Sequence, residues 1–259
     1  MGQRSAIEWT DATWNPVTGC TRISAGCDNC YAATLSTRLL RDIYLAREPV
    51  VDSDLTKRDP FAVRLWPERL PDPLGWREPR HVFVNSMSDL FHRDVPEDFV
   101  EQIFEVMLST PRHTYQVLTK RPSRARRFLQ RHPRFLRAGV LPRHIWIGTS
   151  VEDQAATHRI PHLLQVPAEV RFLSCEPLIG PIDLDPRGLD WVIVGGESGV
   201  RRRVMDPAWA RAIRDRCADA GVAFFFKQWG GRTPKAGGRE LDGVEWNEMP
   251  DAAGLRRRA

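Results

Sequence analysis

The sequence has no long apolar stretch and no apolar segment near its amino terminus. No run approaches the roughly 18 to 20 consecutive apolar residues that a membrane-spanning helix needs. The first residues, MGQRSAIEWTD, lack the apolar core of a secretory signal and show no obvious context for a lipid anchor. We therefore predict a cytoplasmic protein with no membrane partner.

Cysteine is scarce, and the number of cysteines is odd. The 259 residues include 5 cysteines, and three of these fall within one short segment. This pattern is not typical of the paired disulfide framework of a small secreted protein. We therefore expect reduced thiols.

Internal repeats and low-complexity segments are also absent. The length suits one α/β domain, and 42% hydrophobic with 27% charged residues are ordinary values for a globular protein. The 38 Lys and Arg exceed the 33 Asp and Glu, and the formal charge of +5 is compatible with a polyanionic partner without requiring one. We predict a single domain over 1–259, with a glycine-rich peripheral extension over 231–259.

Short apolar, β-branched or aromatic runs recur along the chain at spacings that leave room for helices. The clearest runs are 81–85, 115–119, 145–149, 171–175, 191–195 and 223–227, and 6–10 could supply one further strand. Their nearly continuous apolar character is typical of buried parallel strands. Helical periodicity between the runs predicts helices over 96–109, 121–132, 153–164 and 207–220, whereas 177–189 is rich in Pro and Asp and predicts little helix.

This alternation predicts an α/β fold, either a partial TIM-type (β/α)6-7 barrel with parallel strands or an open doubly wound sheet. In both architectures ligands bind beyond the carboxyl ends of the strands. The candidate cofactor-binding residues at these ends are Asn85, Ser88, Asp89, Lys120, Arg121, Thr149, Ser150, Glu152, Glu176, Glu197 and Lys227. Alternatively, these residues form caps, turns and ion pairs between the cations and carboxylates.

The segment 13–31 contains Cys20, Cys27 and Cys30 in the spacing C-x6-C-x2-C, and a helix can begin at Tyr31. Thiolates suit the iron of an iron–sulfur cluster, glycines let the backbone approach the sulfides, and backbone N–H groups stabilise the negative charge. We predict that these three cysteines are metal ligands. Three ligands on a four-iron cluster would leave one iron open, which favours catalysis.

The cysteine loop could also hold zinc or no metal at all. A structural zinc site would need a fourth ligand from Cys175, Cys217 or His92. Without a metal, the three thiols would be inert or redox-active. Cys175 and Cys217 can equally be core residues.

Several longer motifs carry a resemblance to a known family. They are WNPVTGCTRISAGCDNCYA, VFVNSMSDLFH, YQVLTKRP, IWIGTSVED, RFLSCEPLIGPI, WVIVGGESG and FFFKQWG. With these motifs the chain resembles uncharacterised phage-encoded and bacterial iron–sulfur proteins that are similar to radical S-adenosylmethionine (SAM) enzymes and, distantly, to spore photoproduct lyase. The six-residue first gap departs from the C-x3-C-x2-C pattern common among radical SAM enzymes.

The resemblance implies a partial TIM barrel with a [4Fe-4S] cluster on Cys20, Cys27 and Cys30, and reductive cleavage of SAM. On this basis Asn85, Ser88 and Asp89 would receive the SAM amino group. Thr149, Ser150 and Glu152 would hold the ribose hydroxyls, and Lys120, Arg121 or Lys227 would meet a carboxylate or phosphate. The Gly-Gly-Glu triplet that ends at Glu197 would line the pocket from the opposite side.

These features predict a radical-SAM-like enzyme with an unidentified substrate. The reductive step would require an electron donor such as a flavodoxin or ferredoxin. Nucleic acid is a candidate substrate, since arginines over 121–137, 201–203 and 256–258 suit phosphate contacts, although they can also be solvated surface residues. The alternative functions are an iron–sulfur electron-transfer or redox-regulatory protein that does not use SAM, and a zinc-stapled nucleic-acid-binding module.

Overall fold

One parallel sheet forms the centre of the computed structural model, which describes residues 5–250. The sheet has 7 strands in the order β1-β4-β5-β6-β7-β8-β9. Their bounds are β1 Ala12–Trp14, β4 His81–Val84, β5 Thr114–Thr119, β6 Ile145–Ser150, β7 Arg171–Cys175, β8 Trp191–Gly195 and β9 Ala223–Gln228. The six runs from 81 onward are therefore confirmed as parallel strands.

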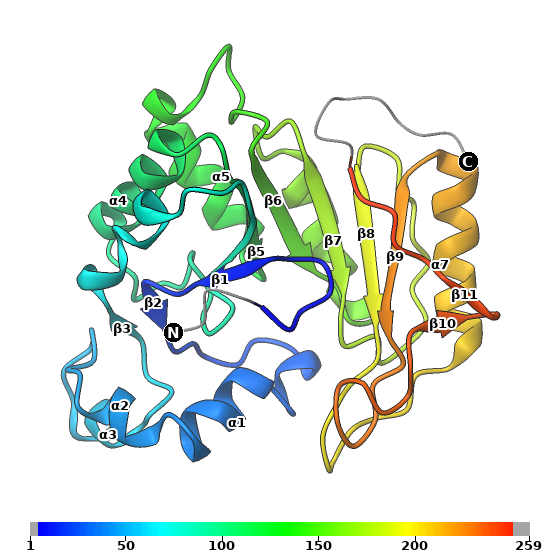
Figure 1. Cartoon of the computed structure of the whole chain (residues 1–259), viewed down its shortest axis with the longest axis horizontal. Coiled ribbons are helices and arrows are strands. Elements are labelled where there is room, and N and C mark those ends of the chain that lie inside the picture. The colour runs from blue at the N-terminus through cyan, green and yellow to red at the C-terminus, as the bar shows by residue number, and fades with distance from the viewer. Residues whose placement is uncertain (1–4, 251–259) are drawn as a thin grey trace.

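The strand order distinguishes between the two predicted architectures. Each strand pairs with the next strand of this sheet along the chain, whereas a doubly wound sheet reverses its order at a switch point. The sheet curls into a half-barrel (Figure 1). The prediction of a partial TIM-type α/β barrel is confirmed.

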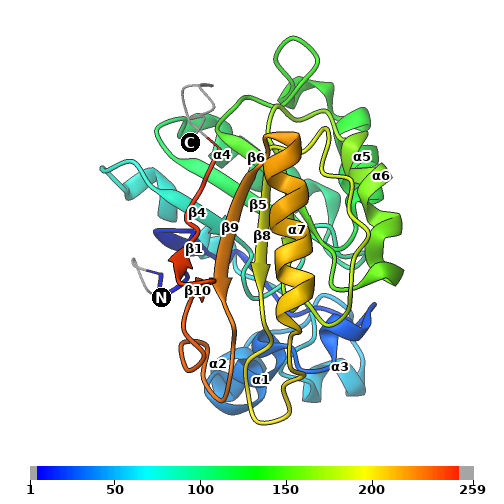
Figure 2. The same cartoon turned by 90° about the vertical axis from the view of Figure 1, so that its right-hand side faces the viewer.

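The helices that follow the strands cover the outer face of the half-barrel. These are α4 Glu97–Ser109, α5 Pro122–Arg131, α6 Ile160–Leu164 and α7 Pro207–Ala220. Figure 2 shows α7 in front of β8 and β9, with α5 and α6 beside it. The predicted helix over 153–164 starts as a 3-10 segment, Gln154–Arg159. The Asp153 side chain caps this segment by accepting from Ala156 N. Pro161 has no N–H to donate to the preceding turn, so the α-helical hydrogen bonds do not extend back through it.

Two apolar layers lie on opposite faces of the sheet, because side chains alternate along each strand. On β8, Val192 and Val194 belong to the outer layer, which includes Ile213 of α7, whereas Trp191 and Ile193 belong to an inner layer built from strand residues and Trp9. The inner layer is closed by aromatic rings: Trp9, Phe83, Trp146, Phe172, Trp191 and Phe225.

The amino-terminal strand was predicted at 6–10, and this prediction is wrong. Residues 7–10 form a turn in which Thr10 N donates to Ile7 O at 3.2 Å, and the ladder begins when Asp11 N donates to His81 O at 3.0 Å. Trp9 turns into the inner layer instead of extending a strand. Burial of the Trp9 indole in the inner layer therefore outweighs the strand that the local apolar pattern favours.

The insertion between β1 and β4 contains short elements around a buried arginine. Their bounds are β2 Val17–Thr18, η1 Ala25–Cys27, α1 Tyr31–Arg38, α2 Arg41–Leu45, α3 Asp54–Arg58, β3 Arg64–Leu65, η2 Pro67–Arg69 and η3 Asp72–Gly75. The Arg64 guanidinium donates to the carbonyls of Arg47, Thr56, Asp59 and Ala62 at 2.7 to 3.2 Å. These bonds satisfy the buried charge and hold an otherwise irregular segment together.

The chain after β9 returns to cover the edge of that strand. A small hairpin, β10 Glu240–Leu241 with β11 Val244–Glu245, leads into a segment in which Trp246 O accepts from Phe226 N at 2.9 Å. Residues 1–4 and 251–259 of the predicted domain and extension lie outside the described part of the chain. Over residues 5–250, no helix is both long and apolar enough to cross a bilayer.

Candidate functional site

The cysteine loop lies at the carboxyl ends of the strands, the end of the molecule where α1 is drawn in Figure 1. Gly19 bridges Ser88 after β4, and Cys20 N donates to Phe61 O at 3.1 Å. The predicted helix start at Tyr31 is confirmed, since α1 begins directly after Cys30. The loop is therefore held between the barrel and the insertion.

The three thiols of this loop are free and half-buried. Burial and the Asp89 carboxylate raise the pKa of Cys20 to about 12, although the Arg121 guanidinium lies 3.7 Å from its sulfur. For Cys27, burial opposes ionisation, but the Lys120 charge together with hydrogen bonds from Ile23 and Ser24 lowers the pKa of that thiol. Cations therefore stand beside two of the three sulfurs, where they suit thiolate or cluster charge.

Asp89 acts as a positioning residue at the end of β4. Its carboxylate accepts from Thr119 Oγ1 at 2.7 Å, Lys120 N at 3.0 Å, Phe91 N at 3.0 Å and Arg121 at 2.6 Å. These four donors occupy both oxygens. Asp89 thus directs Arg121 toward Cys20 by joining the ends of β4 and β5.

Glu152 follows β6 and is fully buried, with cations on both oxygens. Oε1 binds Lys120 and accepts from Ser24 Oγ at 3.1 Å, and Oε2 accepts from Arg159 at 2.9 Å. Burial alone would raise the pKa of Glu152, but Lys120 and Arg159 hold it below its ordinary value. Gly26 packs against this carboxylate so closely that a Cβ there would lie 2.4 Å from Glu152 Cγ.

Glu197, after β8, holds the other side of the cysteine loop. It accepts from Asn29 Nδ2 at 3.0 Å and from Arg203 N and Nε at 2.7 and 3.0 Å. Burial opposes ionisation, but the bonds from Arg203 lower the pKa of Glu197. Arg203 also donates to Ala25 O at 3.0 Å. The late Gly-Gly-Glu triplet therefore contacts the loop directly.

Glu176 and Lys227 form a half-buried pair across β7 and β9, with 2.5 Å between Nζ and Oε1. Tyr31 donates its phenolic hydroxyl to Ser86 O beside β4. Although Tyr31 is 53% exposed, burial of its hydroxyl group raises the pKa of Tyr31, and Cys30 and Glu176 add to this, which places all three groups in one region. The predicted pairing of site cations with carboxylates is thus present.

The candidate residues with hydroxyl or amide side chains form hydrogen bonds at the ends of the strands. Thr149 Oγ1 donates to Thr119 O at 2.7 Å, and Ser88 Oγ donates to Val17 O at 3.0 Å. Ser150 is buried and its carbonyl accepts from Arg159 at 2.8 Å. Asn85 has φ 59°, and its Oδ1 accepts from Val17 N at 3.3 Å. The Asn85 oxygen is therefore engaged, while its buried Nδ2 has no hydrogen-bond partner within residues 5–250.

Of the three suggested fourth ligands of a zinc site, two lie in the core, and His92 is engaged by hydrogen bonds beside the cysteine loop. Cys175 and Cys217 are fully buried in the outer layer, which confirms that both are core residues. His92 Nδ1 accepts from Asp94 N at 3.2 Å, so Nε2 carries the proton that is donated to Thr21 Oγ1 at 2.7 Å. Within residues 5–250, no three His, Cys, Asp or Glu side chains converge to hold a single metal ion.

Three contributors to the site were missed at the sequence level: Ser24, Arg159 and Arg203. Arg203 belongs to the arginine run that was assigned to phosphate contacts, yet it binds Glu197. Arg159 lies within a predicted helix and carried no local signal of its partner. Of the three, only Ser24 could have been identified from the sequence, because it lies in the cysteine loop itself.

The residues present fit an anionic cluster bound by thiolates. The loop offers three free thiols, Lys120 and Arg121 lie beside two of them, and each thiolate of a [4Fe-4S] cluster binds a separate iron. A closed zinc site needs four convergent ligands, and Cys175, Cys217 and His92 do not supply the fourth. The arrangement therefore suits redox chemistry at a partly exposed loop.

Comparisons with curated proteins and with solved structures find no match to this chain. A family model, described as a protein of unknown function, matches residues 4–250. That match covers the half-barrel, the cysteine loop and the carboxylates that hold it. The chain belongs to the DUF5131 family.

Proposed function

We propose that this protein is an iron–sulfur enzyme of the radical SAM type, with a [4Fe-4S] cluster on Cys20, Cys27 and Cys30. The observation that carries the proposal is the loop itself: three free, half-buried thiols at the carboxyl ends of a parallel half-barrel. When bound, such a cluster supplies an electron for reductive cleavage of the SAM sulfonium. The substrate class proposed is nucleic acid, and the electron donor is a flavodoxin or ferredoxin.

The residues of this chain have defined tasks in the proposal. Lys120 and Arg121 compensate negative charge beside Cys27 and Cys20. Asn29 and Ser24 fasten the loop to Glu197 and Glu152, so that the thiols keep their positions. Because Asn85 Oδ1 is engaged by Val17 N, we assign Asn85 to loop support rather than to the SAM amino group.

One observation favours a second function, an iron–sulfur electron-transfer or redox-regulatory protein without SAM. Asp89, Glu152 and Glu197, which were assigned to the cofactor pocket, are all occupied by donors from the protein. A protein of this type needs the cluster and its charge compensation, and it does not need free carboxylates for a second cofactor.

Anaerobic purification followed by iron analysis and electron paramagnetic resonance of the reduced protein tests both functions. We expect a [4Fe-4S] signal that shifts when SAM is added, and loss of bound iron in Cys20→Ser, Cys27→Ser and Cys30→Ser. Cys175→Ala is the matched control and should keep its iron, because Cys175 lies in the outer core. A signal indifferent to SAM would support the electron-transfer function, and a colourless protein without iron would disprove both.

A further inference from the structure

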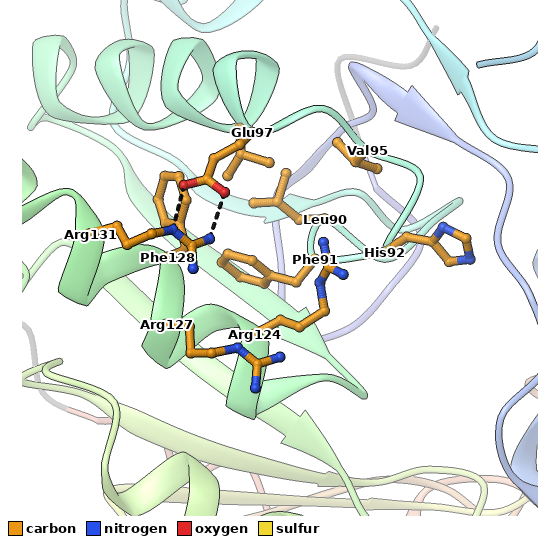
Figure 3. Close-up of a pocket in the computed structure, with 10 residues that line it drawn as sticks. Leu90, Phe91, His92, Val95, Glu97, Arg124, Arg127, Phe128 and Arg131 are labelled. Carbon is orange, nitrogen blue, oxygen red and sulfur yellow. Dashed lines mark hydrogen bonds and ion pairs between the residues drawn. The ribbon is translucent and has the colours of Figure 1, made fainter. Parts of the chain in front are cut away.

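A pocket of about 170 Å³ lies on the outer side of the sheet, between α5 and the segment that follows β4 (Figure 3). Its buried lining is His92 together with the apolar residues Leu90, Phe91, Val95, Val100 and Phe128. Its more exposed lining is charged and consists of Arg124, Arg127 and Arg131 from α5 and Glu97 from α4. We call this site the arginine pocket.

Within residues 5–250, Arg131 is the only one of the three arginines in the arginine pocket whose guanidinium is paired with a carboxylate. Arg131 binds the Glu97 carboxylate with two bonds, Nε to Oε1 at 2.9 Å and a terminal nitrogen to Oε2 at 2.5 Å. Among the described residues, no side-chain hydrogen bond or ion pair joins the guanidinium of Arg124 or Arg127 to a partner. Figure 3 shows Arg124 reaching from α5 toward Phe91 and His92.

The two unpaired arginines are unfavourable in the helix on their own. Positions 124 and 127 are neighbours on one helix face, where like charges repel, and Arg124 stands near the positive end of the helix dipole. Burial lowers the pKa of Arg124, and the charges of Arg127 and Arg121 lower it further. An anion in the pocket would relieve this repulsion.

The arginine pocket shares a wall with the candidate site. His92 lines the pocket, and its Nε2 donates to Thr21 Oγ1 at 2.7 Å, next to Cys20. Arg121, which contacts Cys20, immediately precedes α5. A group bound between Arg124 and Arg127 would therefore lie beside the cysteine loop, near a ligand at the carboxyl ends of the strands.

We propose that the arginine pocket binds a phosphate group through Arg124 and Arg127, and that this phosphate belongs to the substrate. The planar guanidinium fork matches the oxygens of a phosphate, which accepts several bonds at once. Only the identification of the ligand as substrate rests on the proposed function. The phosphate can come from a mononucleotide or from a nucleic-acid strand, which share this chemistry.

Calorimetric titration of the purified protein tests the pocket with two probes, AMP and a short oligothymidylate without terminal phosphates. We expect Arg124→Gln and Arg127→Gln each to weaken binding by about tenfold or more, as loss of a charged hydrogen bond to phosphate should. Arg126→Gln is the matched control: it removes the same charge from the same helix, and Arg126 pairs with Gln165 instead. Thermal denaturation of each variant shows whether it is folded.

The outcomes distinguish the two possible sources of the phosphate. They also distinguish the proposal of a phosphate site from the proposed function. Tighter binding of AMP identifies a phosphate monoester, and tighter, salt-sensitive binding of the oligonucleotide identifies a strand. If Arg126→Gln weakens probe binding equally, or if neither probe binds, the assignment of the arginine pocket as a phosphate site is overturned. Iron measured on the same samples keeps the proposals apart, because phosphate binding through these arginines in a protein without a cluster would contradict only the proposed function.

Discussion

Ionisable side chains at the carboxyl ends of the strands are mostly paired with one another. Asp89, Glu152 and Glu197 each bind an arginine or lysine, and each also holds part of the cysteine loop or the residues beside it. A buried charge that loses its partner is strongly destabilising, because the remaining ion is left without water or compensation. These carboxylates therefore position the loop, and their effects can be measured through stability.

Glu152→Gln is expected to lower the free energy of unfolding by about 3 to 5 kcal/mol. The substitution leaves Lys120 and Arg159 without their shared counter-charge at a side chain that is 1% exposed. Urea denaturation measures the change. Glu97→Gln is the control, because its 43% exposed carboxylate forms surface pairs worth less than about 1 kcal/mol. Equal losses in the two variants would contradict the assignment.

The same carboxylate predicts a pH dependence. Its pKa in the folded protein is below the usual 4.5. The stabilisation by Glu152 is therefore fully present above about 4.5 and is lost as the pH falls through the lower folded value. We expect the difference between wild type and Glu152→Gln to be largest at neutral pH and to shrink in acid. A difference that stays constant well below 4.5 would contradict this.

At the scale of single elements, local pattern and tertiary packing agree along most of the sheet. The runs from 81 onward become strands because their apolar side chains are buried on both faces, by helices outside and aromatic rings inside. The segment 6–10 shows where this agreement fails. Its apolar residues include Trp9, which gains more by packing against Phe83, at 4.7 Å between ring centroids, than by extending a strand.

Gly148 in β6 makes room for a ring inside the half-barrel. A Cβ at this position would lie 2.5 Å from atoms of the Phe172 ring on β7. We expect Gly148→Ala to reduce stability by about 1 to 3 kcal/mol, because overpacking outweighs the modest entropic gain of replacing glycine. Gly75→Ala is the control, since no atom lies within 4 Å of its Cβ position. If the two variants have similar midpoints of urea denaturation, the Phe172 ring moves aside without loss of stability.

At the scale of the whole molecule, the half-barrel is open and its last strand needs cover. The segment after the β10–β11 hairpin provides it, with Phe226 N bonded to Trp246 O at 2.9 Å and Glu248 N bonded to Phe224 O at 3.2 Å. Trp246 also packs against Phe224 at 5.8 Å between centroids. An uncovered edge strand invites pairing with another chain.

A chain that ends at Gly238 should therefore be less stable and should aggregate. The truncation removes the covering segment and exposes the backbone groups of β9. Light scattering during thermal denaturation measures the effect. A chain that ends at Pro250 retains every contact named above and serves as the control. If both chains stay monomeric with the same melting temperature, the covering segment has no protective role.

Local features of the sequence were enough to predict the strands from 81 onward, the helices between them and the cysteine loop, because apolar periodicity and residue spacing act over a few neighbours. Tertiary structure decided the order of the strands and the partners of the charges. Lys120 with Glu152, and Asn29 with Glu197, are far apart in the chain, and neither residue carries a mark of its partner. The curl of the sheet brings these strand ends together, so it decides whether a carboxylate holds the loop or faces a ligand.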